Sequence, residues 1–128
     1  MDAVPRVFRV VVTVADGKKA GRFYGELFGI KGRPVGGGRT YYDCGPVIFA
    51  TLEAPGRPGA ESVYFAVDDL DAVHARARKL RCLSKEDVHG EPAGECIERP
   101  WGERSFYAED PFGNGLCFVD SRTLFTGR

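Results

Sequence analysis

Residues 101–120, WGERSFYAEDPFGNGLCFVD, predict a β-hairpin near the end of the chain. Strand-forming residues precede the turn at 105–108, and an apolar run with β-branched and aromatic members follows it at 116–119. The DPFG sequence at 110–113 suits a type I turn, because proline presets φ at the second position and the aspartate side chain accepts hydrogen bonds from the turn. The NG pair at 114–115 is then expected to supply positive φ and to lead into the return strand.

The composition indicates a small globular domain. The chain has 128 residues, and its 18 basic and 18 acidic side chains balance, so no net field favours nucleic acid or a membrane surface. No apolar run reaches membrane-spanning length and the N-terminus lacks a signal-peptide core, so a cytoplasmic location is expected. The four cysteines include no C-x-x-C pair, which favours free thiols over disulfides or structural zinc.

The first half of the chain predicts a strand, a helix and two further strands. The strand is 7–14, and Asp16 follows it in an N-cap position. From Ala20 the apolar residues recur at i, i+3, i+4, i+7 and i+8, which predicts an amphipathic helix that Gly29 ends. The segments after the helix are a turn-rich stretch and two strands: 34–38, 39–43 and 47–52.

The second half repeats this order after a linker at 54–60, where proline and glycine deny regular structure. A strand at 62–67 leads to a second helix capped at 68–69. Short strands are expected around Val88 and at 96–98, and the closing hairpin completes the half.

The spacing of these elements forms an internal repeat. Arg9 stands seven residues before Asp16, as Ser62 stands seven residues before Asp69. The repeat predicts one α+β domain of two βαβββ modules whose sheets form a concave, partly open, barrel-like surface with the helices outside. The predicted modules span about 6–53 and 62–120.

The repeat and its closing turn resemble the vicinal oxygen chelate superfamily. That superfamily includes the glyoxalases, the bleomycin-resistance proteins and the extradiol dioxygenases. Its members have paired βαβββ modules and end a module with a D-P-x-G-N turn, followed by a strand that carries a metal-binding glutamate. Asp110, Pro111, Gly113 and Asn114 match the turn, whereas Cys117 occupies the glutamate position.

The resemblance implies a central cavity and, in enzymes of the superfamily, one divalent metal bound by the first and last strands of each module. The first-strand positions fall on Arg9 and Ser62, and the last strand of the second module offers Cys117. Arginine cannot bind a metal, and a neutral serine is a poor ligand. The last strand of the first module offers Thr51 or Glu53. We therefore expect no metal site and no cofactor.

Arg9 interrupts an apolar strand, where an unpaired charge is costly to bury. The side chain either extends to solvent or faces the cavity and pairs with a carboxylate. That carboxylate belongs to a side chain such as Glu53 or Glu103, or to an anionic ligand that Arg9 binds through two hydrogen bonds.

Cys117 is either a nucleophile on the cavity floor or a small buried apolar residue, and the absence of a neighbouring histidine in the sequence favours the second interpretation. Trp101 forms either a rim of the cavity or a structural contact between the modules. About half of the strand aromatics are expected in the cavity, where flat rings stack on planar ligands. The predicted cavity residues are Arg9, Thr51, Ser62, Tyr64, Trp101, Arg104 and Cys117.

The two histidines are weak signals. His74 lies on the flank of the second predicted helix and is expected at the surface or its boundary. A relocated metal site is an alternative to a solvated loop, although its spacing matches no known ligand set. The residues of such a site would be His89, Glu91, Glu95 and Cys96. The basic run at 76–81 complements the dipole of that helix, so it does not indicate nucleic-acid binding.

The predicted function is a metal-free, bleomycin-resistance-like protein that sequesters a drug or metabolite. The expected partner is a small organic molecule, anionic or aromatic, and not a nucleic acid or a membrane. A homodimer is expected because it would cover the open sheet edges. Two alternatives remain: a metal-dependent lyase, isomerase or dioxygenase with displaced ligands, and a metal-free enzyme that uses Arg9, a tyrosine or Cys117. No residue is assigned a catalytic role, because no nucleophile is paired with a base.

Overall fold

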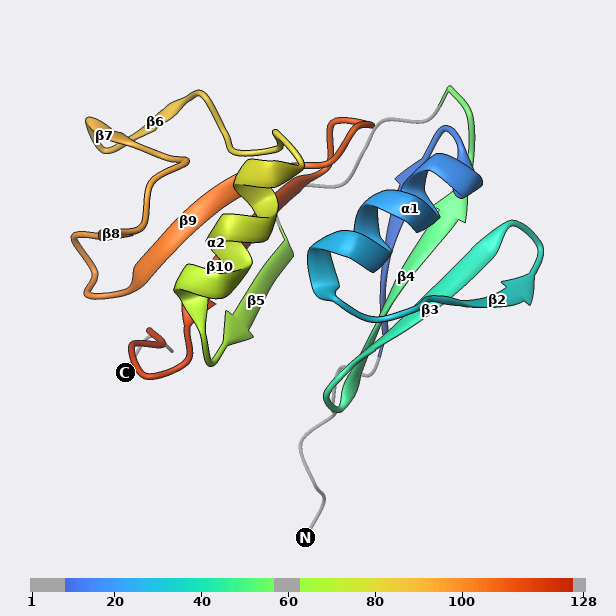
Figure 1. Cartoon of the computed structure of the whole chain (residues 1–128), viewed down its shortest axis with the longest axis horizontal. Coiled ribbons are helices and arrows are strands. Elements are labelled where there is room, and N and C mark those ends of the chain that lie inside the picture. Colours follow the sequence, from blue (N-terminus) through green and yellow to red (C-terminus); the bar gives the residue numbers. More distant parts are fainter. Residues whose placement is uncertain (1–8, 57–62, 126–128) are drawn as a thin grey trace, which may run out of the picture.

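The computed structural model describes residues 9–56 and 63–125. The elements of the first half are β1 (Arg9–Val14), α1 (Gly17–Phe28), β2 (Arg33–Gly36), β3 (Arg39–Cys44) and β4 (Val47–Glu53) (Figure 1). They form a mixed sheet of order β1-β4-β3-β2 with one helix. β1 lies parallel to β4, and the other neighbours are antiparallel.

The second half builds a sheet of the same design. Its elements are β5 (Val63–Val67), α2 (Leu70–Lys79), β6 (Asp87–Val88), β7 (Glu91–Pro92), β8 (Ile97–Glu98), β9 (Arg104–Glu109) and β10 (Gly115–Asp120). The sheet order is β5-β10-β9-β8 with β5 parallel to β10, while β6 and β7 form a separate ribbon. The two sheets do not close into a barrel, so the predicted partly open α+β fold of two βαβββ modules is confirmed. Neither described helix is long and apolar enough to cross a membrane.

Side-chain caps set the helix boundaries. Asp16 accepts a hydrogen bond from the backbone N–H of Lys19 at 3.0 Å, and Asp69 accepts one from Ala72 at 3.0 Å. Each carboxylate satisfies an N–H that the first helical turn leaves without a partner. Gly29 ends α1 with φ of 72°, a left-handed conformation that glycine adopts without steric cost. These predicted helix ends are confirmed.

Of the segment predicted as turn-rich, 34–38, residues 37–38 form a turn, whereas 34–36 belong to β2. β2 pairs with β3, with a bulge between Pro34 and Gly36. Because β2 is the edge strand of its sheet, Pro34 costs no hydrogen bond of the ladder. Gly32 precedes this strand, where an added Cβ would lie 2.7 Å from the ring of Tyr42. The prediction was wrong for 34–36 because proline and glycine usually disfavour strands, whereas an edge strand tolerates them.

The closing hairpin is present, with β9 and β10 antiparallel as predicted. The N–H of Gly113 donates to the carbonyl of Asp110 at 3.2 Å, which closes the turn at 110–113. Positive φ occurs at Gly113, at 88°, and not at 114–115 as predicted. Asn114, directly before β10, is instead held by hydrogen bonds to Asp110.

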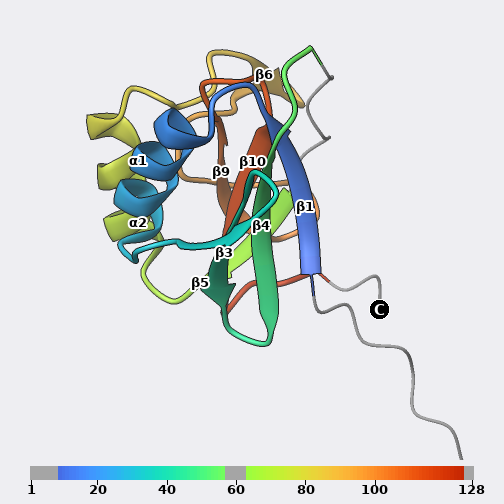
Figure 2. The same cartoon turned by 90° about the vertical axis from the view of Figure 1, so that its right-hand side faces the viewer.

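Each sheet has an inner face toward its helix and an outer face away from it. Both helices lie on one side of the strands in Figure 2. Side chains alternate along a strand, so the buried residues Val12 and Phe49 mark the inner face of the first sheet. Phe65, Phe106 and Phe118 mark the inner face of the second sheet.

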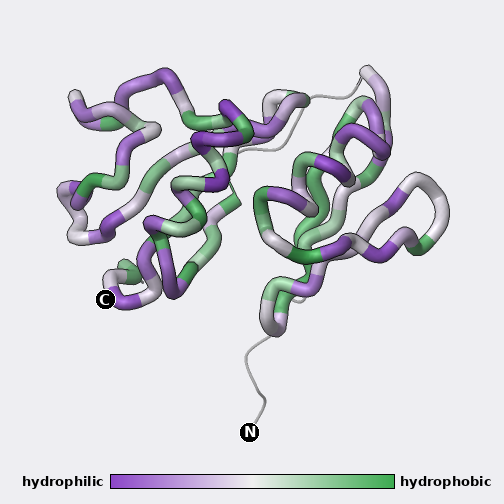
Figure 3. The backbone as a smooth tube through the Cα atoms, viewed as in Figure 1, coloured by the Kyte–Doolittle hydropathy of each residue, from purple (hydrophilic) through white to green (hydrophobic). Residues whose placement is uncertain are grey.

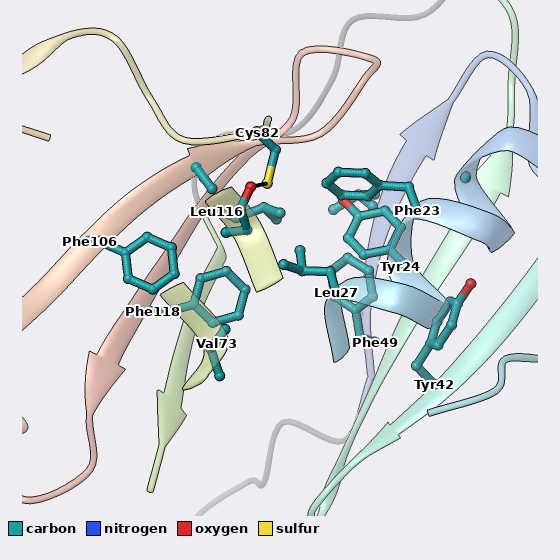
Figure 4. Packing of buried hydrophobic residues seen from close by; sticks show 14 of the residues in the cluster. Phe23, Tyr24, Leu27, Tyr42, Phe49, Val73, Cys82, Phe106, Leu116 and Phe118 are labelled. Atoms are coloured by element: carbon teal, nitrogen blue, oxygen red, sulfur yellow. Dashed lines mark hydrogen bonds between the residues drawn. The ribbon is translucent and has the colours of Figure 1, made fainter. Parts of the chain in front are cut away.

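The two inner faces share one hydrophobic core. The ring centroid of Phe65 lies 5.4 Å from that of Phe49, 5.3 Å from that of Phe28 and 5.0 Å from that of Phe118. Figure 4 shows buried side chains of both modules meeting between the sheets, and Figure 3 shows hydrophobic and hydrophilic residues alternating around both helices. Burying one phenylalanine contributes about 1.5–3 kcal/mol, so this contact holds the modules together. Because the inner faces meet, the outer faces point away from the shared core.

His74 belongs to this inner layer and not to the surface or boundary predicted for it. Its side chain is 8% exposed. The Nε2 atom lies 2.8 Å from the carbonyl oxygen of Gly94, and the ring packs edge-on against Phe106. The histidine therefore joins α2 to the loop before β8.

The carboxylate of Asp110 joins the closing hairpin to the first module. Its Oδ1 accepts hydrogen bonds from the N–H groups of Phe112 and Asn114, both at 2.8 Å. Its Oδ2 accepts from the hydroxyl of Tyr24 on α1 at 2.8 Å and from the side-chain amide of Asn114. That amide also donates to the carbonyl of Thr13 on β1 at 2.7 Å. Burial and the neighbouring carboxylate both raise the pKa of Tyr24, so its hydroxyl remains a donor.

We expect Asp110→Ala to lower the free energy of unfolding by about 3 kcal/mol or more, because several buried donors lose a charged acceptor. Tyr24→Phe should cost about 1–2 kcal/mol, and the double variant should cost less than the sum. Urea unfolding measures all three. Asp87→Ala, at an exposed position, is the control and should stay within about 0.5 kcal/mol of the parent. A loss below about 1 kcal/mol for Asp110→Ala would contradict this role.

Candidate functional site

The outer face of the second sheet gathers polar and aromatic side chains. Cys117 on β10 pairs with Tyr64 on β5 and with Tyr107 on β9. Val119 on β10 pairs in the same way with Ser105 on β9. These residues alternate with the core phenylalanines, so they lie on the outer face.

A hollow of about 630 Å³ opens on this face. The segment after β10 forms one of its walls with Leu124 and Phe125. Its remaining lining residues include Tyr64, Ala66, Trp101, Glu103 and Val119. The hollow therefore combines aromatic rings from three parts of the chain with a single carboxylate.

Glu103 fastens this wall to the sheet. Its Oε1 accepts a hydrogen bond from the indole Nε1 of Trp101 at 2.7 Å, and its Oε2 accepts one from the backbone N–H of Phe125 at 2.8 Å. The backbone N–H of Arg104 donates to the hydroxyl of Thr123 at 3.0 Å, which adds a second attachment. Trp101 thus lines the hollow, and its contacts with Glu103 and His89 lie within the second module and not between the modules.

Cys117 lies beside the hollow but is completely buried. Burial raises the pKa of its thiol to about 11. The pKa of the adjacent Tyr107 is raised for the same reason. At neutral pH both side chains are therefore protonated, and the sulfur lacks the thiolate that a nucleophile needs.

Arg99 is a buried residue of this region that no sequence pattern indicates. It is 2% exposed, and its guanidinium lies 5.3 Å from the centroid of the Tyr107 ring. It donates to the hydroxyl of Ser105 and to four backbone carbonyls, those of Pro92, Ala93, Glu95 and Ser105. The guanidinium therefore holds the loop before β8 against β9. Only its hydrogen bonds to distant backbone reveal this role.

Arg9 lies on the outer face of the other sheet. It is exposed, and its guanidinium lies 5.6 Å from the centroid of the Tyr41 ring. Glu53 is at the opposite end of the β1–β4 pair, where it accepts from the N–H of Gly17. Glu103 is in the second sheet. Neither carboxylate is thus the partner of Arg9 that the sequence suggested.

The other predicted cavity residues are not gathered in one place. Thr51 is buried on the inner face of β4, and Arg104 pairs with Asp71 of α2 at 2.9 Å. Ser62 lies outside the described residues. The structure therefore brings together Tyr64, Trp101 and Cys117, and places Arg9, Thr51 and Arg104 elsewhere.

The residues at the superfamily's metal positions do not suit a divalent ion. Arg9 and Cys117 lie on outer faces of different sheets, and a protonated thiol and a guanidinium are not ligands. The outer face of β4 presents Ile48, Ala50 and Leu52, and not the Thr51 or Glu53 that the sequence offered. Within 9–56 and 63–125, no three His, Cys, Asp or Glu side chains gather, and this includes the relocated site considered around His89.

A larger hollow of about 900 Å³ lies between the modules. Its walls are apolar and include Leu27, Phe28 and Phe65. Two of its polar residues serve the fold, since Asp69 caps α2 and Arg76 donates to the carbonyl of Leu27 at 3.2 Å. Of the predicted cavity residues that the structure describes, Tyr64 alone lines it, so the outer-face hollow is the better candidate site.

The profile of the glyoxalase/bleomycin resistance protein/dioxygenase superfamily matches residues 6–118. The chain therefore belongs to this superfamily. A search of curated proteins finds no match.

Solved structures with the same fold include enzymes and a resistance protein. The oxidase ChaP-H1 has a TM-score of 0.77 and 22% identity, with 98% of this chain and 100% of that chain covered. A bleomycin resistance determinant encoded on the transposon Tn5 has a TM-score of 0.72 and 16% identity, with 91% and 98% covered. A lactoylglutathione lyase from Agrobacterium tumefaciens has a TM-score of 0.70 and 19% identity, with 94% and 97% covered. At these identities the likeness concerns the fold.

We expect Cys44 and Cys96, which are half-buried, to react with iodoacetamide before Cys82 and Cys117 in the native protein at pH 8. Burial raises the pKa of Cys82 and of Cys117 to about 11. The pKa of these thiols is thus higher in the folded state than the ordinary value of about 8.5. Their contribution to stability is fully present below that ordinary pKa and is lost as pH rises toward 11. Peptide mass mapping measures the order, with urea-unfolded protein as the control. Modification of Cys117 as fast as Cys44 would contradict the buried, protonated thiol.

Proposed function

We propose that this protein binds a small planar organic molecule in the outer-face hollow of the second sheet and sequesters it. The observation that supports this most is the exposure of large rings around the hollow. Tyr64 is 58% exposed and Phe125 is 57% exposed, although both are large and apolar. Exposed aromatic groups around a concavity are typical of binding sites, because flat rings offer contact area with little loss of side-chain entropy.

Sequestration accounts for the chemistry of the hollow better than turnover does. The neighbouring thiol of Cys117 is protonated at neutral pH, since burial raises its pKa to about 11. No histidine is among the described lining residues, and the carboxylate there, Glu103, accepts hydrogen bonds from Trp101 and Phe125 and from no nucleophile. The superfamily's metal positions also carry unsuitable side chains. A binding role needs none of these groups.

A second copy of the chain is proposed to complete the site. The outer faces of the two sheets point away from the shared core, so one chain leaves its hollow open on one side. Val11 on the outer face of β1 is 43% exposed, and Leu124 beside the hollow is 47% exposed. If the first sheet of a second copy covered the hollow, Val11 of one copy and Leu124 of the other would both be buried, and the ligand would be enclosed. Val11 and Tyr41 would then face the hollow of the partner.

Titration with 2-naphthamide, a neutral planar probe, tests the binding role. Trp101 is the only tryptophan of the chain, so its fluorescence reports directly on the hollow. We expect saturable quenching, and Tyr64→Ala should weaken binding by about tenfold or more, because a lost aromatic contact and its buried area are worth about 1.4 kcal/mol.

Ile30→Ala is the matched control, because Ile30 lines the hollow between the modules and is likewise exposed. This variant should bind the probe as the parent does. Weaker binding by Ile30→Ala would move the site to the hollow between the modules, which Tyr64 also lines. A lack of quenching in the parent would contradict the proposed function itself.

A further inference from the structure

Glu103 is a buried carboxylate that no positive charge neutralises in the described chain. The residue is 8% exposed, and it lines the outer-face hollow. Its two hydrogen-bond donors, the Trp101 indole and the Phe125 backbone N–H, are both neutral. Among residues 9–56 and 63–125, no lysine, arginine or histidine forms an ion pair with it.

The neighbouring arginines are engaged elsewhere. Arg99 directs its guanidinium to Ser105 and to backbone carbonyls. Arg104 follows Glu103 in the chain, but its side chain turns to the inner side of the sheet and pairs with Asp71 at 2.9 Å. The hollow therefore contains a negative charge whose complement does not come from these side chains.

A cation would suit this carboxylate on three physical grounds. An ionised carboxylate has about four acceptor positions, and the Trp101 indole and the Phe125 backbone N–H occupy two of them. Burying a charge without a partner is costly, so an opposite charge from a ligand would relieve that cost. The surrounding rings of Tyr64, Trp101 and Phe125 also favour a cation, because an aromatic face carries negative electrostatic potential.

We propose that the ligand of this hollow carries a positively charged nitrogen, as an ammonium or amidinium group next to a planar apolar body, and that Glu103 binds it. This inference rests on the proposed function and specifies the ligand class of the same site. It differs from the anionic ligand that Arg9 suggested in the sequence, because Arg9 lies on the other sheet. Glu103 sets the charge preference, and the rings set the preference for a flat molecule.

Three fragments of nearly equal shape test the charge preference: benzamidine, benzamide and benzoate, which are cationic, neutral and anionic at pH 7. The single indole N–H signal of Trp101 in a ¹H–¹⁵N NMR spectrum reports their binding, because this group contacts Glu103. We expect benzamidine to bind about tenfold more tightly than benzamide, and benzoate to bind weakest, since tenfold is the scale of a charge-assisted hydrogen bond.

Two variants test whether Glu103 provides the charge preference. Glu103→Gln should reduce the affinity for benzamidine to that for benzamide, whereas Glu109→Gln, at the exposed last residue of β9, should keep the parent's preference. The comparison of the three fragments on the parent protein needs no variant, so a folding defect of Glu103→Gln leaves the test intact.

Equal affinity for the three fragments would overturn the cation preference and leave the proposed binding function in place. Tighter binding of benzoate would also overturn it and would point to an anionic ligand. Unchanged selectivity in a folded Glu103→Gln variant would show that another group provides the charge preference. If none of the fragments shifts the Trp101 signal, both the cation preference and the binding site itself are contradicted.

Discussion

The buried carboxylate of Asp110 is the interaction on which the rest of the structure depends. It accepts hydrogen bonds from its own turn, from Tyr24 on α1 and from Asn114, whose amide reaches the carbonyl of Thr13 on β1. One side chain thus connects the last hairpin of the second module to the first strand and helix of the first module. A buried polar group in such a network fixes a single arrangement, because any displacement leaves unsatisfied donors.

The position of the candidate site follows from that arrangement. With the hairpin fixed against the first module, the inner residues of β10 and β9 complete the core shared with Phe49 and Phe65. Strand alternation then directs Cys117 and Tyr107 to the outer face. The chain after β10 folds back over the same face, and Glu103 holds it there through the N–H of Phe125. The hollow is therefore a consequence of how the modules pack as much as of its own residues.

The sequence predicted local features well and long-range ones poorly. The caps and the 110–113 turn follow from short-range chemistry, and the structure contains them. β2 was missed because the tolerance of Pro34 depends on its edge position in the sheet. Thr51 was expected in the cavity, but one step of strand register places it on the inner face. The contact between Glu103 and Phe125 spans 22 residues, and no local pattern marks it.

One chain's second sheet and another chain's first sheet are proposed to enclose the ligand together. Backbone amide NMR shifts on addition of 2-naphthamide test it most directly. We predict changes in β5, β9 and β10 together with changes in β1 and β3 around Val11 and Tyr41. These outer faces belong to different sheets, so we expect changes in both when a second copy contributes to the site. Changes restricted to the residues around the hollow between the modules, 27–30 and 44–47, would contradict the account, and changes in the second sheet alone would contradict the shared site.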